Sequence, residues 1–122
     1  MEKMQDIKSL ISDVWCEPLC TEILTKKIDV SIYSKLNENI PDDFLIIEDI
    51  FFEDDFENIL SSFGEYLSED NLFPFLGLLG EAIICIGFGC ENRGDIFYFD
   101  FDFGCIQIGD DDLINFINKL VN

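Results

Sequence analysis

The stretch GDIFYFDFDFG, residues 94–104, carries five aromatic rings and three carboxylates between two glycines. Its four phenylalanines occupy every second position, at Phe97, Phe99, Phe101 and Phe103. Because alternate side chains of a β-strand point to opposite faces of its sheet, we predict a strand over residues 95–100 with its phenylalanines in the core. The intervening side chains then face the other side, where the aspartates meet solvent, and they are Tyr98, Asp100 and Asp102. The chain then turns near Gly104 and returns through CIQI, residues 105–108, as a hairpin.

Other apolar runs predict further strands. FLII, residues 44–47, is a strand candidate that IFF, residues 50–52, extends or pairs with. AIICIGF, residues 82–88, is a continuous apolar run bounded by glycines, which is typical of a buried strand. The longer run 72–90 is almost uncharged, but Glu81 would lie near the centre of a bilayer. No Lys or Arg closely flanks this run, so we expect a buried loop and strand there and no membrane span.

Apolar residues at spacings of three and four predict helices over residues 2–15, 53–67 and 113–121. A second short helix is expected to begin near Pro18, because proline suits the first turn of a helix. Three aspartates precede the last helix, where they cap it and complement its dipole, and they are Asp110, Asp111 and Asp112.

The order of these elements predicts an α+β fold, in which helices pack against a mostly antiparallel sheet. The length of 122 residues fits a single domain, 1–122. We divide it into an N-terminal helical part, 1–35, and an acidic α+β core, 36–122. Residues 29–36 are compatible with a helix capped by Asp29 or with a strand.

The formal net charge is −19, and it is unevenly distributed. Acidic and basic residues are nearly equal in number over residues 1–35, whereas residues 36–122 contain only two basic residues, Arg93 and Lys119. Such a surface repels nucleic acid and anionic membrane, since both are bound through Lys and Arg. It attracts a basic protein partner and accelerates the encounter at low salt. Solubility, or adaptation to a salty cell, is the alternative explanation for the charge.

The five cysteines form no Cys-x-x-Cys pair, and the chain has no histidine. We therefore expect reduced, mostly buried cysteines in a cytoplasmic protein, with no metal and no other cofactor. Nucleophile pairs of the Ser-His or Cys-His type are ruled out within the chain, so we expect no enzyme. The N-terminal ten residues hold no apolar segment of signal-peptide type.

Two short acidic motifs match parts of known functional sites but lack the other residues that those sites need. Asp102-Phe103-Gly104 matches a kinase element, but a kinase also needs a catalytic His-Arg-Asp. Asp100 and Asp102 fail the EF-hand pattern, because Gly104 stands where the third ligand belongs. A weak calcium site that includes the aspartates before the last helix stays an alternative to solvated carboxylates.

Three segments of the last 40 residues resemble a known family core. IICIGFG resembles a strand that ends in Ile-Gly, RGDIFYFD a Gly-Asp-aromatic strand, and IGDDDLINFINKL a closing helix with an acidic cap. Together they resemble the SUKH superfamily, whose members include bacterial toxin-immunity proteins and a fungal cell-wall regulator. IYSKLNENIPDDFLI resembles its earlier helix, turn and strand more loosely, because the family's turn glycine is absent.

The resemblance implies an immunity protein that binds and neutralises a toxin domain, often a nuclease. We expect a monomer whose partner is a basic toxin domain, with no nucleic acid or membrane bound. The alternative is a SUKH-like regulatory or scaffold module without a toxin partner. The candidate contact residues are one aromatic anchor and four acids near the hairpin, with a second acidic patch, namely Tyr98, Asp100, Asp102, Asp110 and Asp111, then Glu53, Asp54 and Asp55.

Overall fold

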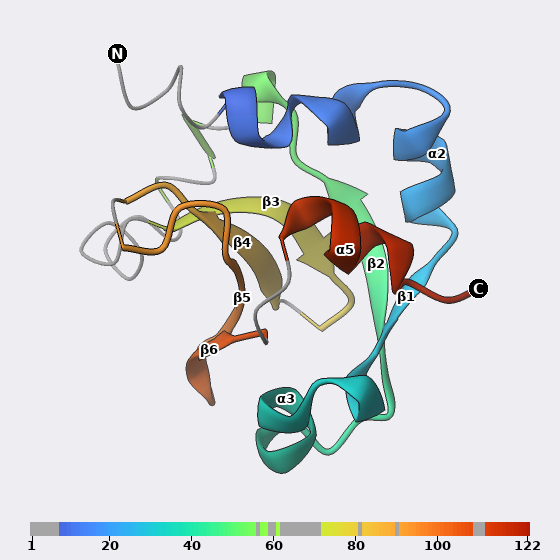
Figure 1. Ribbon diagram of the computed structural model, residues 1–122, viewed down its shortest axis with the longest axis vertical. Helices are drawn as coiled ribbons and strands as arrows, with labels where there is room; N and C mark the ends of the chain where they lie inside the picture. The colour runs from blue at the N-terminus through green and yellow to red at the C-terminus, as the bar shows by residue number, and fades with distance from the viewer. Residues whose placement is uncertain are drawn as a thin grey trace.

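The computed structural model describes residues 8–55, 57–58, 61, 72–80, 82–89, 91–108 and 112–122 (Figure 1). These residues form one antiparallel sheet in which each strand pairs with its neighbours in sequence, in the order β1-β2-β3-β4-β5-β6. The predicted α+β class and antiparallel sheet are therefore confirmed. The strands are β1 (Lys27–Asp29), β2 (Phe44–Ile50), β3 (Leu72–Leu78), β4 (Ile83–Gly87), β5 (Ile96–Asp100) and β6 (Gly104–Gln107).

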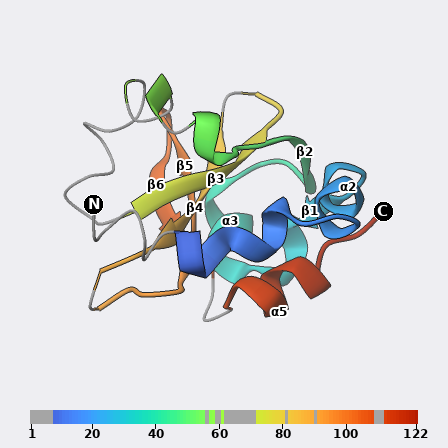
Figure 2. The ribbon, with the colours of Figure 1, turned by 90° about the horizontal axis from the view of Figure 1, so that it is seen from above.

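Short helices cover one face of this sheet. Seen from above, the N-terminal helical segment, α3 and α5 lie on the same side of the strands (Figure 2). The N-terminal segment is helical over residues 8–11 and continues as the 3-10 helix η1. The helices are η1 (Ser12–Trp15), α2 (Leu19–Leu24), η2 (Val30–Ile32), α3 (Ser34–Asn39), η3 (Glu53–Asp55) and α5 (Leu113–Asn118).

The main core lies between the helices and this face of the sheet. Ile11, Leu36 and Phe116 come from three of the helical segments, and each is fully buried against the strands. Phe75 of β3 meets the Phe116 ring edge to face, with 6.5 Å between ring centres. Such a pair contributes roughly 0.5–1.5 kcal/mol beyond the area that it buries. The last helix is thereby fixed to the centre of the sheet.

The opposite face of the sheet carries a second, smaller apolar cluster. Its buried members come from three strands, and two partly buried rings, Phe51 and Phe97, pack against it. The central strands are therefore apolar on both faces, and every residue of β3 and β4 is buried. The buried members of this second cluster are Leu72, Ile83, Cys85 and Phe99.

Strand β5 alternates as predicted, but its two faces differ from the expectation. Phe99 is buried and Phe97 is partly buried in the second cluster, whereas Tyr98 points into the main core. The prediction of a solvent-facing Tyr98 is wrong, because alternation separates two faces without saying which of them is covered. Phe101 and Phe103, which the same alternation assigned to the core, are 56% and 50% exposed.

The N-terminal part, 1–35, is not wholly helical. Residues Lys27–Asp29 form β1, which pairs with β2 and bridges to Val121 near the C-terminus. Within the ambiguous segment 29–36, Asp29 caps η2 by accepting a hydrogen bond from the Ser31 backbone, at 3.0 Å. A strand of three residues carries too little pattern to be recognised, and its partners far along the chain determine it.

The helix predicted over residues 53–67 lies mostly outside the described residues. Its first residues form η3, and residues 57–58 and 61 are helical. The last helix is confirmed, with Asp112 as its N-cap, accepting from the Asn115 backbone at 2.9 Å.

Substituting two phenylalanines of the same motif should give very different results. Phe99→Ala should lower the free energy of unfolding by about 3–5 kcal/mol, because it leaves a cavity in the second cluster. Phe101→Ala should change it by less than about 1 kcal/mol, because that ring is more than half exposed. Urea unfolding measures both, and equal losses would contradict the two-faced arrangement of β5.

Candidate partner-binding surface

The β5–β6 hairpin presents the acidic motif on a rigid turn. Asp100 pairs with Gly104, so residues 101–103 form the loop, which we call the hairpin tip. Gly104 adopts a φ of 78°, a conformation that glycine reaches without the steric cost of a side chain. The Asp100 carboxylate accepts hydrogen bonds from the Asp102 backbone N–H, at 2.8 Å, and from the Phe103 backbone N–H. Its other oxygen accepts from the Tyr98 hydroxyl.

These hydrogen bonds give the two predicted acids different roles. The half-buried Asp100 uses its carboxylate inside the protein, where it holds the turn closed. Asp102 is exposed and leaves its own carboxylate toward solvent at the end of the hairpin. A partner approaching the hairpin therefore meets Asp102 between the exposed rings of Phe101 and Phe103.

Tyr98 does not serve as a surface anchor, because it is only 4% exposed. Burial, together with the hydrogen bond to Asp100 and the charge of that carboxylate, raises the pKa of the Tyr98 hydroxyl well above its ordinary value. The hydroxyl therefore stays protonated and donates at any physiological pH. Tyr98 links the main core to the turn that Asp100 closes.

Asp110 and Asp111, predicted to join this hairpin patch, lie outside the described residues. The second predicted patch lies in η3 at the end of β2. Asp54 is exposed, whereas Asp55 is half-buried and accepts a hydrogen bond from the Phe52 backbone at 2.9 Å. Glu53 belongs to η3 by its backbone, and its side chain lies outside the described part.

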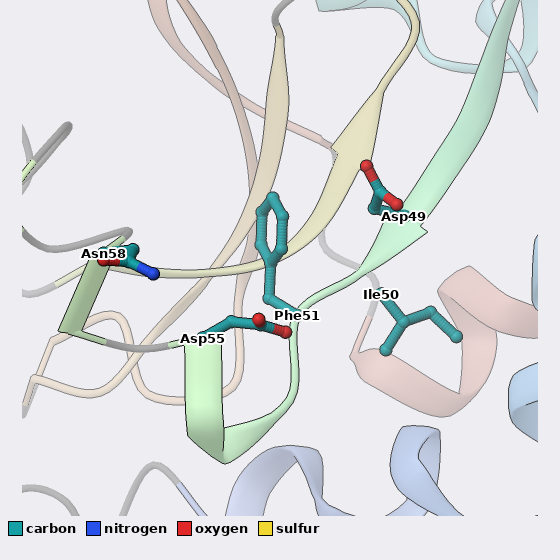
Figure 3. A pocket seen from close by; sticks show the side chains of 5 residues that line it. All are labelled: Asp49, Ile50, Phe51, Asp55 and Asn58. Carbon is teal, nitrogen blue, oxygen red and sulfur yellow. The ribbon is translucent and has the colours of Figure 1, made fainter.

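A hollow of about 250 Å³ opens beside η3 (Figure 3). The Phe51 ring stands between Asp49 and Asn58, Asp55 lies at the foot of the ring, and Ile50 points away. The hollow is smaller than the roughly 300–1,000 Å³ of ordinary ligand pockets, so its volume suits a single side chain. Asp49 and Phe51 were not among the sequence candidates, since their place depends on a bulge between Ile47 and Asp49.

The described residues contain no group of three or more His, Cys, Asp or Glu side chains arranged to hold a metal ion. In the part of the chain that the structure describes, no helix is long and apolar enough to cross a membrane. Four cysteines lie among the described residues, with Cys20 and Cys85 buried and Cys16 and Cys105 exposed.

The different roles of Asp100 and Asp102 predict different effects of their substitution on the free energy of unfolding. Asp100→Ala should lower the free energy of unfolding by about 2 kcal/mol, because two backbone N–H groups and one hydroxyl lose their acceptor. Asp102→Ala should change it by less than about 0.5 kcal/mol. Asp100→Asn keeps an acceptor oxygen and should fall between the two. A loss for Asp102→Ala as large as that for Asp100→Ala would show that the assignment is wrong.

The raised pKa of Tyr98 should make the free energy of unfolding fall at high pH. Below about pH 10 both states keep the phenol protonated, and the wild type should exceed Tyr98→Phe by about 1–2 kcal/mol. Above that pH the unfolded state loses the proton first, because the pKa is raised only in the folded protein. The difference between wild type and variant should then shrink as the pH rises. Urea unfolding of both proteins from about pH 8 to about pH 11 tests this, and a constant difference would refute it.

Comparison with known proteins assigns the chain to a family. No curated protein matches the chain. A family model called RhsPI matches residues 22–121, a region that contains all six strands and α5. Because this match spans most of the chain, the protein belongs to the RhsPI family, an immunity-type family associated with Rhs toxins.

Proposed function

We propose that this protein binds the toxin domain of a cognate Rhs protein and neutralises it, and that this domain is basic and of the nuclease type. The observation that carries the proposal is the family match across residues 22–121. The net charge of −19 supports the basic character of the partner. A nuclease must hold phosphate with Lys and Arg, so an acidic protein complements the surface that binds its substrate.

The mechanism proposed is occlusion in two stages. Carboxylates that the fold leaves toward solvent, such as Glu48 and Asp54, attract the toxin over a long range and set the association rate. Exposed apolar side chains then make close contacts that set the dissociation rate. Charge alone gives a fast encounter, and the apolar contacts make the complex long-lived.

Several further properties belong to the same proposal. The protein acts by binding, without catalysis or a cofactor, as a monomer in the cytoplasm of a bacterium. Its core is related to the SUKH superfamily through the strand and helix motifs of residues 83–120. The alternative function, a regulatory or scaffold module without a toxin, would require a partner that is not encoded beside it.

The test is binding and protection with the C-terminal domain of the Rhs protein encoded beside this gene. The association rate constant should fall by about tenfold or more when salt rises from about 20 mM to about 500 mM. Co-expression should rescue cells from that domain, whereas an unrelated protein of similar negative charge should not. Absence of binding would reject the proposal, and salt-independent association would reject the part assigned to charge.

A further inference from the structure

We propose that the toxin domain docks on the outer face of β2, and that an arginine of the toxin enters the hollow around Phe51. This inference rests on the proposed function and names the surface that performs it. We use the name β2 outer face for the side chains that point away from the main core along this strand and its end, with one neighbour from the β3–β4 turn. They are Phe44, Ile46, Asp49, Phe51 and Leu79.

The register of the sheet places these residues on one side. Leu45 and Ile47 point into the main core, so Phe44 and Ile46 point the other way. A bulge after Ile47 shifts the alternation, and Ile50 then takes the inward position. A Cβ built on Gly77 would lie 2.9 Å from the Phe51 ring and 3.4 Å from the Asp49 Cβ atom. Asp49 and Phe51 therefore share the outer face with the bare glycine between them.

Large apolar side chains are exposed on this face. Ile46 is 51% exposed and Leu79 is 60% exposed, and the Leu79 backbone donates a hydrogen bond to the Ile46 carbonyl at 2.9 Å. Phe44 is exposed beside them, under the ammonium group of Lys27, which lies 4.4 Å from the ring centre. Neighbouring exposed apolar side chains mark interaction sites more often than scattered ones do.

The hollow at the other end of the face has the chemistry that recognises a guanidinium. Asp49 supplies a carboxylate beside the Phe51 ring, Asp55 supplies another at its foot, and the ring supplies a flat π-surface (Figure 3). One oxygen of the Asp55 carboxylate accepts a hydrogen bond from the Phe52 backbone N–H, and the carboxylate can accept further hydrogen bonds from a partner. Arginine pairs with carboxylates through a planar fork of donors and stacks on aromatic rings, which lysine does less well.

The backbone at the hollow is held in place before any partner arrives. The Phe51 backbone N–H donates to the Phe75 carbonyl at 3.0 Å, and the Phe51 carbonyl accepts from the Trp15 indole at 3.0 Å. The ring itself packs over Gly77 against the second cluster. A site fixed in this way loses little conformational entropy on binding, which favours tight association.

Charge selects the occupant of this face. Asp42, Asp43, Glu48 and Asp54 are all exposed along β2 or at its ends, and they outnumber Lys27, whose ammonium group lies over the Phe44 ring. A second copy of this chain would bring its own charge of −19 against them, so self-association is disfavoured. The partner that fits is a basic surface with apolar side chains beside an arginine.

Two pairs of variants of the full-length protein test the proposal against the same Rhs toxin domain. Asp49→Lys and Asp102→Lys change the net charge equally, so a general effect on steering appears in both and cancels in the comparison. Ile46→Thr has a matched control in Ile114→Thr, because Ile114 is also 51% exposed but lies on α5, which packs on the other face. Binding by surface plasmon resonance and the unfolding midpoint of each variant are measured together.

We expect Asp49→Lys and Ile46→Thr each to raise the dissociation constant by about tenfold or more, mainly through faster dissociation. Asp102→Lys and Ile114→Thr should change it by less than about threefold. Equal effects within each pair would overturn the docking surface while leaving the proposed function intact. Loss confined to Asp102→Lys would assign docking to the hairpin tip instead. No binding by the wild type would overturn both proposals, and a stable wild-type dimer broken by Ile46→Thr would assign the face to self-association.

Discussion

The structure depends on the burial of its central strands from both sides. The side chains of β4 alternate between the main core and the second cluster, with Ile84 and Ile86 on one face and Ile83 and Cys85 on the other. A strand buried in this way has no position for a charge, since an unpaired buried carboxylate is costly. Neither β3 nor β4 contains an acidic residue, and the described acids lie on other elements and turns. The apolar side chains of the sequence therefore fill the central strands, and the negative charge lies outside these two strands.

This confinement divides the aspartates into two groups. Some act as acceptors for backbone N–H groups at turns and helix starts, where the negative charge and the short side chain both help. Asp29, Asp55, Asp100 and Asp112 are of this kind. Others, such as Asp49, Asp54 and Asp102, leave their side chains exposed to solvent. A carboxylate of the second group can meet a partner without a cost to the fold, which is why matched pairs of aspartates separate function from stability.

Sequence patterns predicted those helices and strands whose own residues show a clear apolar stripe, cap or run. The closing helix was recognised from its apolar stripe and its aspartate cap, and β4 from its unbroken apolar run. In contrast, β1 has three residues, and β3 contains Pro74, which argues against a central strand until the bulge between Pro74 and Leu76 is known. The site was less predictable still. Alternation predicted that Tyr98 and its neighbouring phenylalanines face opposite ways, but which face is covered depends on helices distant in sequence.

The exposed apolar side chains of β2 and the negative charge around them are best understood together. An exposed apolar face is an aggregation liability for most proteins, and negative charge is a common protection against it. A large net negative charge repels further copies of the same chain while it attracts a molecule of the opposite sign. Ile46 and Leu79 can therefore stay exposed, because the net charge of the chain discriminates against partners that are not basic. In this arrangement the charge that keeps the free protein apart from its copies also selects the partner for which the apolar contacts are kept.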